Sequence, residues 1–124
     1  MKKINCYSTS IPITGRSVLT SHLLNELADS VSACSNEIVK AIITPISLSN
    51  DGWCQEFRID VFFYEKETAS KPKKYAILME TAYNCDQPFD WDKLAEHYTV
   101  IPNGISSCYA GPSKIAYLII GEKK

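Results

Sequence analysis

The stretch Trp53–Tyr64 constrains the fold most, because its side chains alternate between apolar and polar types. One set of alternate positions carries the apolar residues Trp53, Phe57, Ile59, Val61 and Phe63. The intervening positions include the charged residues Glu56, Arg58 and Asp60. A period of two residues predicts a β-strand with one face in a core and the other in solvent. Turn-forming residues at 50–52 and charged residues at 65–67 define its two ends.

Size and composition predict one globular domain. The chain has 124 residues, of which 45% are hydrophobic and 22% charged, and it lacks internal repeats. No segment approaches the ~18 apolar residues that cross a membrane. Met1-Lys2-Lys3 is not followed by the apolar core of a secretion signal, which favours a cytoplasmic location. The net charge of −1 and a single basic cluster at Lys71–Lys74 argue against nucleic acid as the main partner.

The cysteines indicate neither a disulfide framework nor a metal site. They are odd in number, widely spaced and never in a C-x-x-C pair: Cys6, Cys34, Cys54, Cys85 and Cys108. Free cysteine behaves as a small apolar side chain, so we expect buried free thiols. We therefore expect no metal and no cofactor.

The N-terminal half predicts strand, helix and strand in that order. Lys2–Ile13 favours a short edge strand, because Pro12 has no N–H for a ladder. Ser17 is a candidate N-cap for a helix that ends at Ser35-Asn36. Its apolar stripe consists of Val18, Leu19, Leu23, Leu24, Leu27, Ala28, Val31 and Cys34. Glu37–Leu48 then predicts a strand that Pro45 interrupts on one side, joined to Trp53–Tyr64 by a hairpin turn.

The stretch Tyr75–Tyr83 follows a charged loop and fits two structures. Its alternation favours a strand, whereas its Ala, Leu, Met and Glu residues favour a helix. We predict a strand that forms a second hairpin with Trp53–Tyr64, which would place Trp53–Tyr64 in the middle of a meander.

The C-terminal third predicts a loop at Cys85–Pro88, a short helix and a final strand. Asp90 is the expected N-cap of that helix, with Phe89 packing on Leu94. Turns are expected at 102–104 and 111–112, which leaves at most a short strand between them. Lys114–Ile120 is an unbroken apolar run, typical of a strand buried on both faces. The predicted fold is a single-domain α+β two-layer sandwich with a mostly antiparallel sheet and the order β-α-β-β-β-α-β.

The polar face of the predicted strand Trp53–Tyr64 is one candidate site. Glu56, Arg58 and Asp60 would lie ~7 Å apart along it and could line a cleft or contact a partner. The alternative is a solvated ladder of alternating charge. Acid–base catalysis by the two carboxylates is disfavoured, because Arg58 between them would lower both pKa values. A metal site from Asp60 and Glu80 lacks the lysine expected two residues after such a glutamate.

A nucleophilic cysteine is the second candidate. Cys85 or Cys108 would have to meet His97 and an orienting Asn or Asp, and no local motif specifies this pairing. Phosphate-loop, dinucleotide-binding and nucleophile-elbow motifs are absent from the sequence, so an enzyme is the less favoured class.

Aromatic residues supply the third candidate, a binding surface. The loop-rich C-terminal third carries Tyr83, Phe89, Trp91, Tyr98 and Tyr109. Core packing and loop anchoring explain such residues as well, but tyrosine and tryptophan also dominate protein interfaces.

One hairpin resembles a known family. The strand ending at Leu48, the segment 50–53 and the pattern Glu56-x-x-Ile59-x-Val61-Phe62 resemble the central hairpin of phage tail-terminator proteins. The resemblance covers about a quarter of the chain, and the strand before the first helix departs from it.

Two functions remain open for this chain. The first is a non-enzymatic module that binds a protein partner or self-associates, such as an inhibitor or phage structural part. The second is a small enzyme or small-molecule binder.

Overall fold

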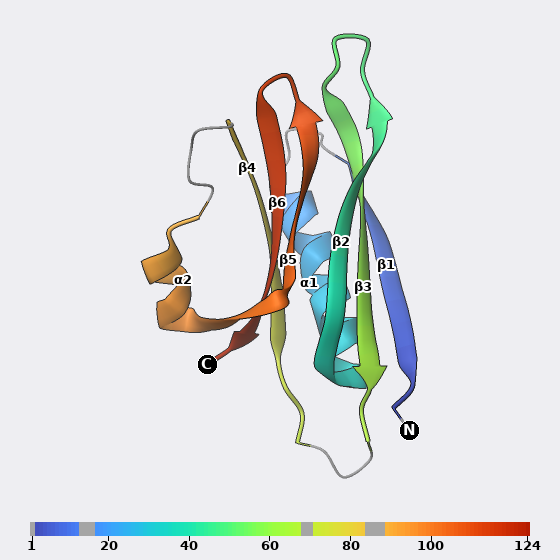
Figure 1. Cartoon of the computed structure of the whole chain (residues 1–124), viewed down its shortest axis with the longest axis vertical. Coiled ribbons are helices and arrows are strands. Elements are labelled where there is room, and N and C mark those ends of the chain that lie inside the picture. The colour runs from blue at the N-terminus through green and yellow to red at the C-terminus, as the bar shows by residue number, and fades with distance from the viewer. Residues whose placement is uncertain (1, 13–16, 68–70, 84–88) are drawn as a thin grey trace.

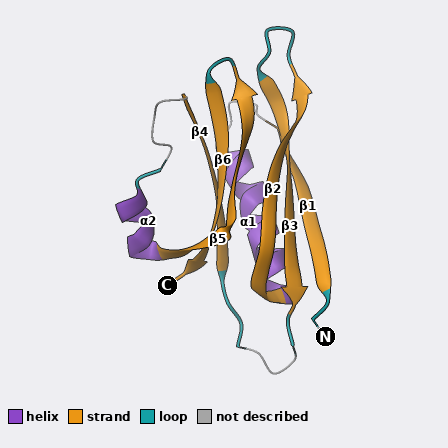
Figure 2. Ribbon diagram, viewed as in Figure 1, coloured by secondary structure: helices purple, strands orange, loops and turns teal. Residues whose placement is uncertain are grey.

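The computed structural model describes residues 2–12, 17–67, 71–83 and 89–124, with the backbone alone for 17–20. It is an α+β fold in which two small antiparallel sheets lie side by side and one long helix covers their inner faces (Figures 1 and 2). The elements in chain order are β1 (Ile4–Pro12), α1 (Ser17–Cys34), β2 (Ser35–Leu48), β3 (Cys54–Glu65), β4 (Tyr75–Tyr83), α2 (Trp91–His97), β5 (Tyr98–Gly111) and β6 (Lys114–Lys123).

The strand β3 is the centre of the first sheet, whose order is β1-β3-β2. Four predicted core residues are fully buried: Phe57, Ile59, Val61 and Phe63. Trp53 does not belong to this core, because it is 38% exposed and precedes the strand. Leu48 pairs with Cys54 and Ser47 with Glu56, so Gln55 is an extra residue on β3. This bulge turns Cys54 inward in place of Trp53.

The stretch Tyr75–Tyr83 is a strand, as predicted, but it pairs with β6 rather than with β3. The predicted meander is therefore wrong. The free edge of β3 is occupied by β1, in register from Ile4 opposite Tyr64 to Pro12 opposite Glu56. The second sheet has the order β4-β6-β5, with β6 buried between its neighbours as its apolar run predicted.

The predicted turn at 102–104 is wrong as well. The strand β5 continues from Tyr98 to Gly111 and bulges between Val100 and Ile105. A Cβ atom added to Gly104 would lie 2.7 Å from the Cβ of Ile120, so only glycine allows this close approach. The sheet thus absorbs a turn-like sequence as a bulge, which adds a sixth strand to the predicted order.

The helix α1 packs between the two outer strands, β1 and β4. Leu24, Leu27, Ala28 and Val31 of the predicted stripe are buried. On the side of α1 that faces β4, the Ser32 hydroxyl accepts a hydrogen bond from the Tyr75 amide at 2.9 Å. The side chains of Ser17, Val18 and Leu19 lie outside the described residues, as does the predicted loop at 85–88. The helix therefore closes the open side of the curved pair of sheets.

The short helix α2 begins where predicted. Asp90 is its N-cap, with a carboxylate oxygen accepting the Lys93 amide at 3.1 Å. None of the helix residues is buried, and the ring of Phe89 lies 5.9 Å from that of Trp91.

Candidate functional site

Two hairpin turns meet at one end of the molecule, seen at the top of Figure 1. The turn between β2 and β3 holds Gly52 at a φ of 86°, and the turn between β5 and β6 contains Ser113 at a φ of 58°. The Tyr109 hydroxyl donates to the Gly52 carbonyl at 2.8 Å. This bond ties the first sheet to the second at their tips.

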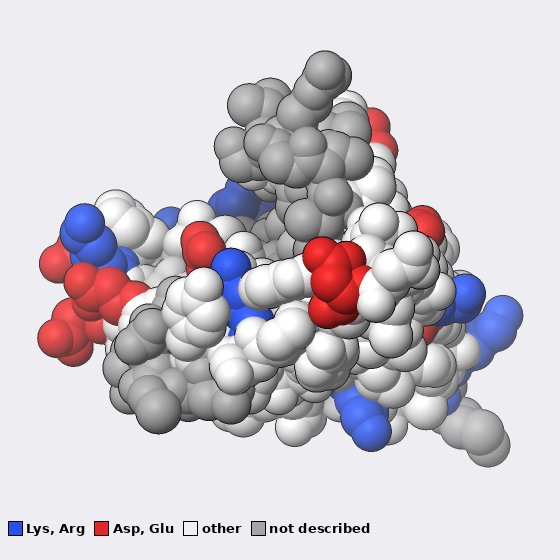
Figure 3. Space-filling model, turned by 90° about the horizontal axis from the view of Figure 1, so that it is seen from above, with Lys and Arg blue, Asp and Glu red and all other residues white. Residues whose placement is uncertain are grey.

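Exposed apolar side chains gather around these turns. We call these apolar side chains, together with Lys114, the hairpin-end surface; its members are Leu48, Trp53, Tyr83, Tyr109 and Lys114. Leu48 is 58% exposed, Tyr83 55%, Tyr109 46% and Trp53 38%. Figure 3 looks down on this end, where uncharged side chains surround a few acidic and basic groups.

The Trp53 ring is held in place by the opposite hairpin. A Cβ atom added to Gly111 would lie 2.2 Å from a ring carbon of Trp53, so the ring lies directly on the glycine backbone. Any larger residue at 111 would displace it. One face of the indole is thereby fixed, while more than a third of the residue remains exposed.

Lys114 provides the cation of the hairpin-end surface. Its Nζ lies 5.5 Å from the ring centroid of Tyr83 and 6.0 Å from that of Trp53, within the range of cation–π attraction. Among the described residues it makes no ion pair with a carboxylate. The hairpin-end surface therefore combines rigid aromatic groups with one positive charge that is open to an acidic group.

The predicted polar face lies on the outer side of the first sheet and pairs within itself. The Arg58 Nε donates to both carboxylate oxygens of Asp60 at 3.1 and 3.2 Å, and the Ser8 hydroxyl donates to the same carboxylate. Glu56 lies on the same face, opposite Pro12. Glu80 belongs to β4 in the other sheet. These contacts satisfy the Asp60 carboxylate within the face itself.

The structure divides the predicted aromatic surface into two groups. Tyr83 and Tyr109 belong to the hairpin-end surface, whereas Phe89, Trp91 and Tyr98 lie at α2, lower in the view of Figure 1. The sequence reasoning missed Leu48, Trp53 and Lys114 as surface residues. A signal was present, because all three flank the predicted turns at 50–52 and 111–112.

The structure does not bring Cys108 to His97. His97 ends α2 and Cys108 lies near the far end of β5, roughly 25–30 Å away at the usual rise of a strand. Burial raises the pKa of the Cys108 thiol to about 11, with a further contribution from Cys54, which opposes formation of a thiolate. Four cysteines are free and Cys85 lies outside the described residues. Cys54 is buried as predicted, while Cys6, Cys34 and Cys108 are half-buried.

In the described part of the chain, His, Cys, Asp and Glu side chains form no group of three or more that could hold a metal ion. Over the same residues, neither helix has the length and apolar character needed to span a membrane. Comparison of the chain with protein-family models, with curated proteins and with solved structures finds no match.

Proposed function

We propose that the protein is a non-enzymatic binding or assembly module that acts in the cytoplasm through protein contacts at its hairpin-end surface. An inhibitor of another protein and a phage structural component are two concrete forms of this function. The exposed aromatic rings held around Lys114 are the observation that carries the proposal. Gly111 fixes the ring of Trp53, and the bond to Gly52 fixes that of Tyr109, so little side-chain entropy is lost when these two rings are covered.

The composition of the hairpin-end surface supports a protein partner. Aromatic residues are the commonest source of binding energy at protein interfaces, and desolvation by the surrounding rings strengthens an ion pair to Lys114. We therefore expect the partner to present an apolar surface with a carboxylate.

The test is capture of a partner by matched single variants. Leu48→Ser and Tyr83→Ser remove exposed apolar groups from the hairpin-end surface. Ile4→Ser is the control, because Ile4 is 54% exposed but lies at the opposite end of the molecule. The tagged wild-type protein and Ile4→Ser should retain the same host protein, and the other two variants should lose most of it at unchanged melting temperature. Equal capture by all four proteins contradicts the proposal.

A further inference from the structure

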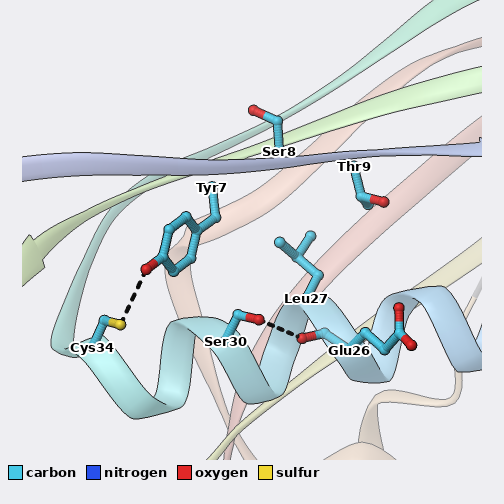
Figure 4. Close-up of a pocket in the computed structure, with 7 residues that line it drawn as sticks. All are labelled: Tyr7, Ser8, Thr9, Glu26, Leu27, Ser30 and Cys34. Atoms are coloured by element: carbon cyan, nitrogen blue, oxygen red, sulfur yellow. Dashed lines mark hydrogen bonds between the residues drawn. The ribbon is translucent and has the colours of Figure 1, made fainter.

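A groove runs between β1 and α1, on the side of the molecule away from β2. It has a volume of about 460 Å³. Tyr7 and Thr9 of β1 point into it, and Glu26, Leu27 and Ser30 of α1 form its other wall (Figure 4). The Tyr7 hydroxyl closes one end through a 3.2 Å contact with the Cys34 sulfur. The groove therefore lies beside the middle of an edge strand.

The register shows which backbone groups of β1 face away from β3. The Glu65 amide donates to the Lys3 carbonyl at 2.9 Å, and these two residues continue the register that pairs Ile4 with Tyr64. Hydrogen-bonded pairs alternate along an antiparallel ladder. Odd-numbered residues of β1 therefore bond β3. The even-numbered residues direct their N–H and C=O groups to the open edge: Ile4, Cys6, Ser8 and Ser10.

Two local features agree with this assignment. Pro12 has an even number, so its missing N–H falls on the open edge, where proline is tolerated. The Cys6 amide donates a hydrogen bond to the side-chain carbonyl oxygen of Asn5 at 2.8 Å, rather than to a neighbouring strand. Within the described residues, β1 pairs with β3 alone. The edge also lacks the charged side chains that usually protect edge strands, because none of the nine residues of β1 is charged.

We propose that this edge binds an extended segment of another protein, which adds to β1 as a further strand and carries a basic side chain over Glu26. The outward N–H and C=O groups of Ser8 and Ser10 would pair with the backbone of the segment. Alternate side chains of the segment would enter the groove and rest on α1.

The charge of α1 selects a basic segment. Its described acidic residues are Glu26 and Asp29, and its one basic group is His22, whose Nε2 lies 2.9 Å from Glu26. Glu26 is the only acidic residue among the described residues that line the groove. A lysine or arginine at the facing position of the segment would meet this carboxylate, whereas an acidic residue would be repelled by it.

A second copy of this chain is the less favourable occupant. The β1 strand of a second copy could pair with this edge, but none of its nine residues is charged. It would place no lysine or arginine opposite Glu26, whereas a basic segment would.

The first test is a titration of the ¹⁵N-labelled protein with a capped nonapeptide of alternating threonine and valine that carries one central lysine. We expect shifts and slowed hydrogen exchange at the Ser8 and Ser10 amides, while the Tyr7 and Thr9 amides, already bonded to β3, keep their exchange rates. Unchanged Ser8 and Ser10 amides at millimolar peptide would overturn the proposal.

Three variants refine the test. Ser10→Pro removes the outward N–H and should weaken binding about fivefold, whereas Ser10→Ala keeps the N–H and should bind as the wild type does. Glu26→Gln should reduce the preference for the lysine peptide over a glutamate peptide about threefold. Equal peptide affinity of the two Ser10 variants would refute the assignment of the outward backbone groups. An unchanged preference for the lysine peptide in Glu26→Gln would refute the role of Glu26. A dimer that sediments in the wild type and is lost in Ser10→Pro would assign the edge to self-pairing instead.

Discussion

The sharpest prediction concerns Phe57, whose side chain is fully buried in the core. Phe57 is 0% exposed, and its strand β3 pairs with β1 on one side and β2 on the other. Phe57→Ala removes a whole ring from a fully buried site on the central strand of the first sheet, so the substitution leaves a cavity in the core. Substitutions of this kind cost about 3–5 kcal/mol, out of a total of about 5–15 kcal/mol for a domain.

The expected change in melting temperature follows from the size of the chain. At ~2.1 cal/mol/K per residue, 124 residues give an unfolding entropy of about 0.26 kcal/mol/K. Phe57→Ala should therefore lower Tm by roughly 12–19 °C, measured by circular dichroism at fixed protein concentration.

Arg58→Ala is the matched control, because Arg58 is the next residue along β3 and faces outward. Its side chain is 54% exposed, although that of Asp60 is only 16% exposed, so water screens the ion pair from the Arg58 side and it is worth less than about 1 kcal/mol. Tm should fall by less than about 4 °C. Equal losses in the two variants would show that the alternation along β3 does not separate core from surface, and would refute the reasoning.

Three further predictions test other contacts. Ser35 is fully buried and its hydroxyl bonds a β3 carbonyl at 2.6 Å, so Ser35→Ala should cost about 1–3 kcal/mol in urea unfolding. Gly104→Ala should cost about 1–3 kcal/mol in the same assay, because its Cβ would overlap Ile120. Burial raises the pKa of the Tyr75 hydroxyl from 10.0 to about 12 and that of the Cys108 thiol from 9.0 to about 11. Both groups ionise first in the unfolded chain, so stability should hold below about pH 9 and fall toward pH 12, and Tyr75→Phe should flatten the upper part of the curve.

The sequence was sufficient for features that depend on neighbouring residues. The alternation along β3, the apolar stripe of α1, the Asp90 cap and the hairpin at Gly52 are local patterns, and the structure contains them. Pairing between distant strands has no such signal. Nothing within Tyr75–Tyr83 distinguishes β6 from β3 as its partner, because an alternating apolar strand fits either. The extra strand was missed for a related reason, since Pro102-Asn103-Gly104 forms a turn in isolation and a bulge when Ile120 packs against Gly104.

The candidate surfaces were predictable only in part, because exposure depends on where the two sheets meet. The alternation predicts Trp53 in the core. Because Gln55 is an extra residue on β3, Cys54 points inward instead and Trp53 lies at the surface. Tyr83 and Tyr109 were predicted as binding residues, but their proximity to Lys114 and Gly52 arises from the alignment of two hairpins that are distant in the sequence.

The two prolines in the first sheet carry information about its edges that the sequence alone left ambiguous. Pro45 is opposite Phe57, which bonds β1, so the nitrogen of Pro45 faces away from β3 and pairing continues through it. The Ile43 amide, two residues earlier, points the same way and donates to the Ser106 hydroxyl of β5 at 3.2 Å. Pro12 faces away from β3 on the other side of the sheet. A proline that is retained within a strand thus marks the side on which its ladder ends. On the β2 side that space is taken by β5, and on the β1 side it opens into the groove beside α1.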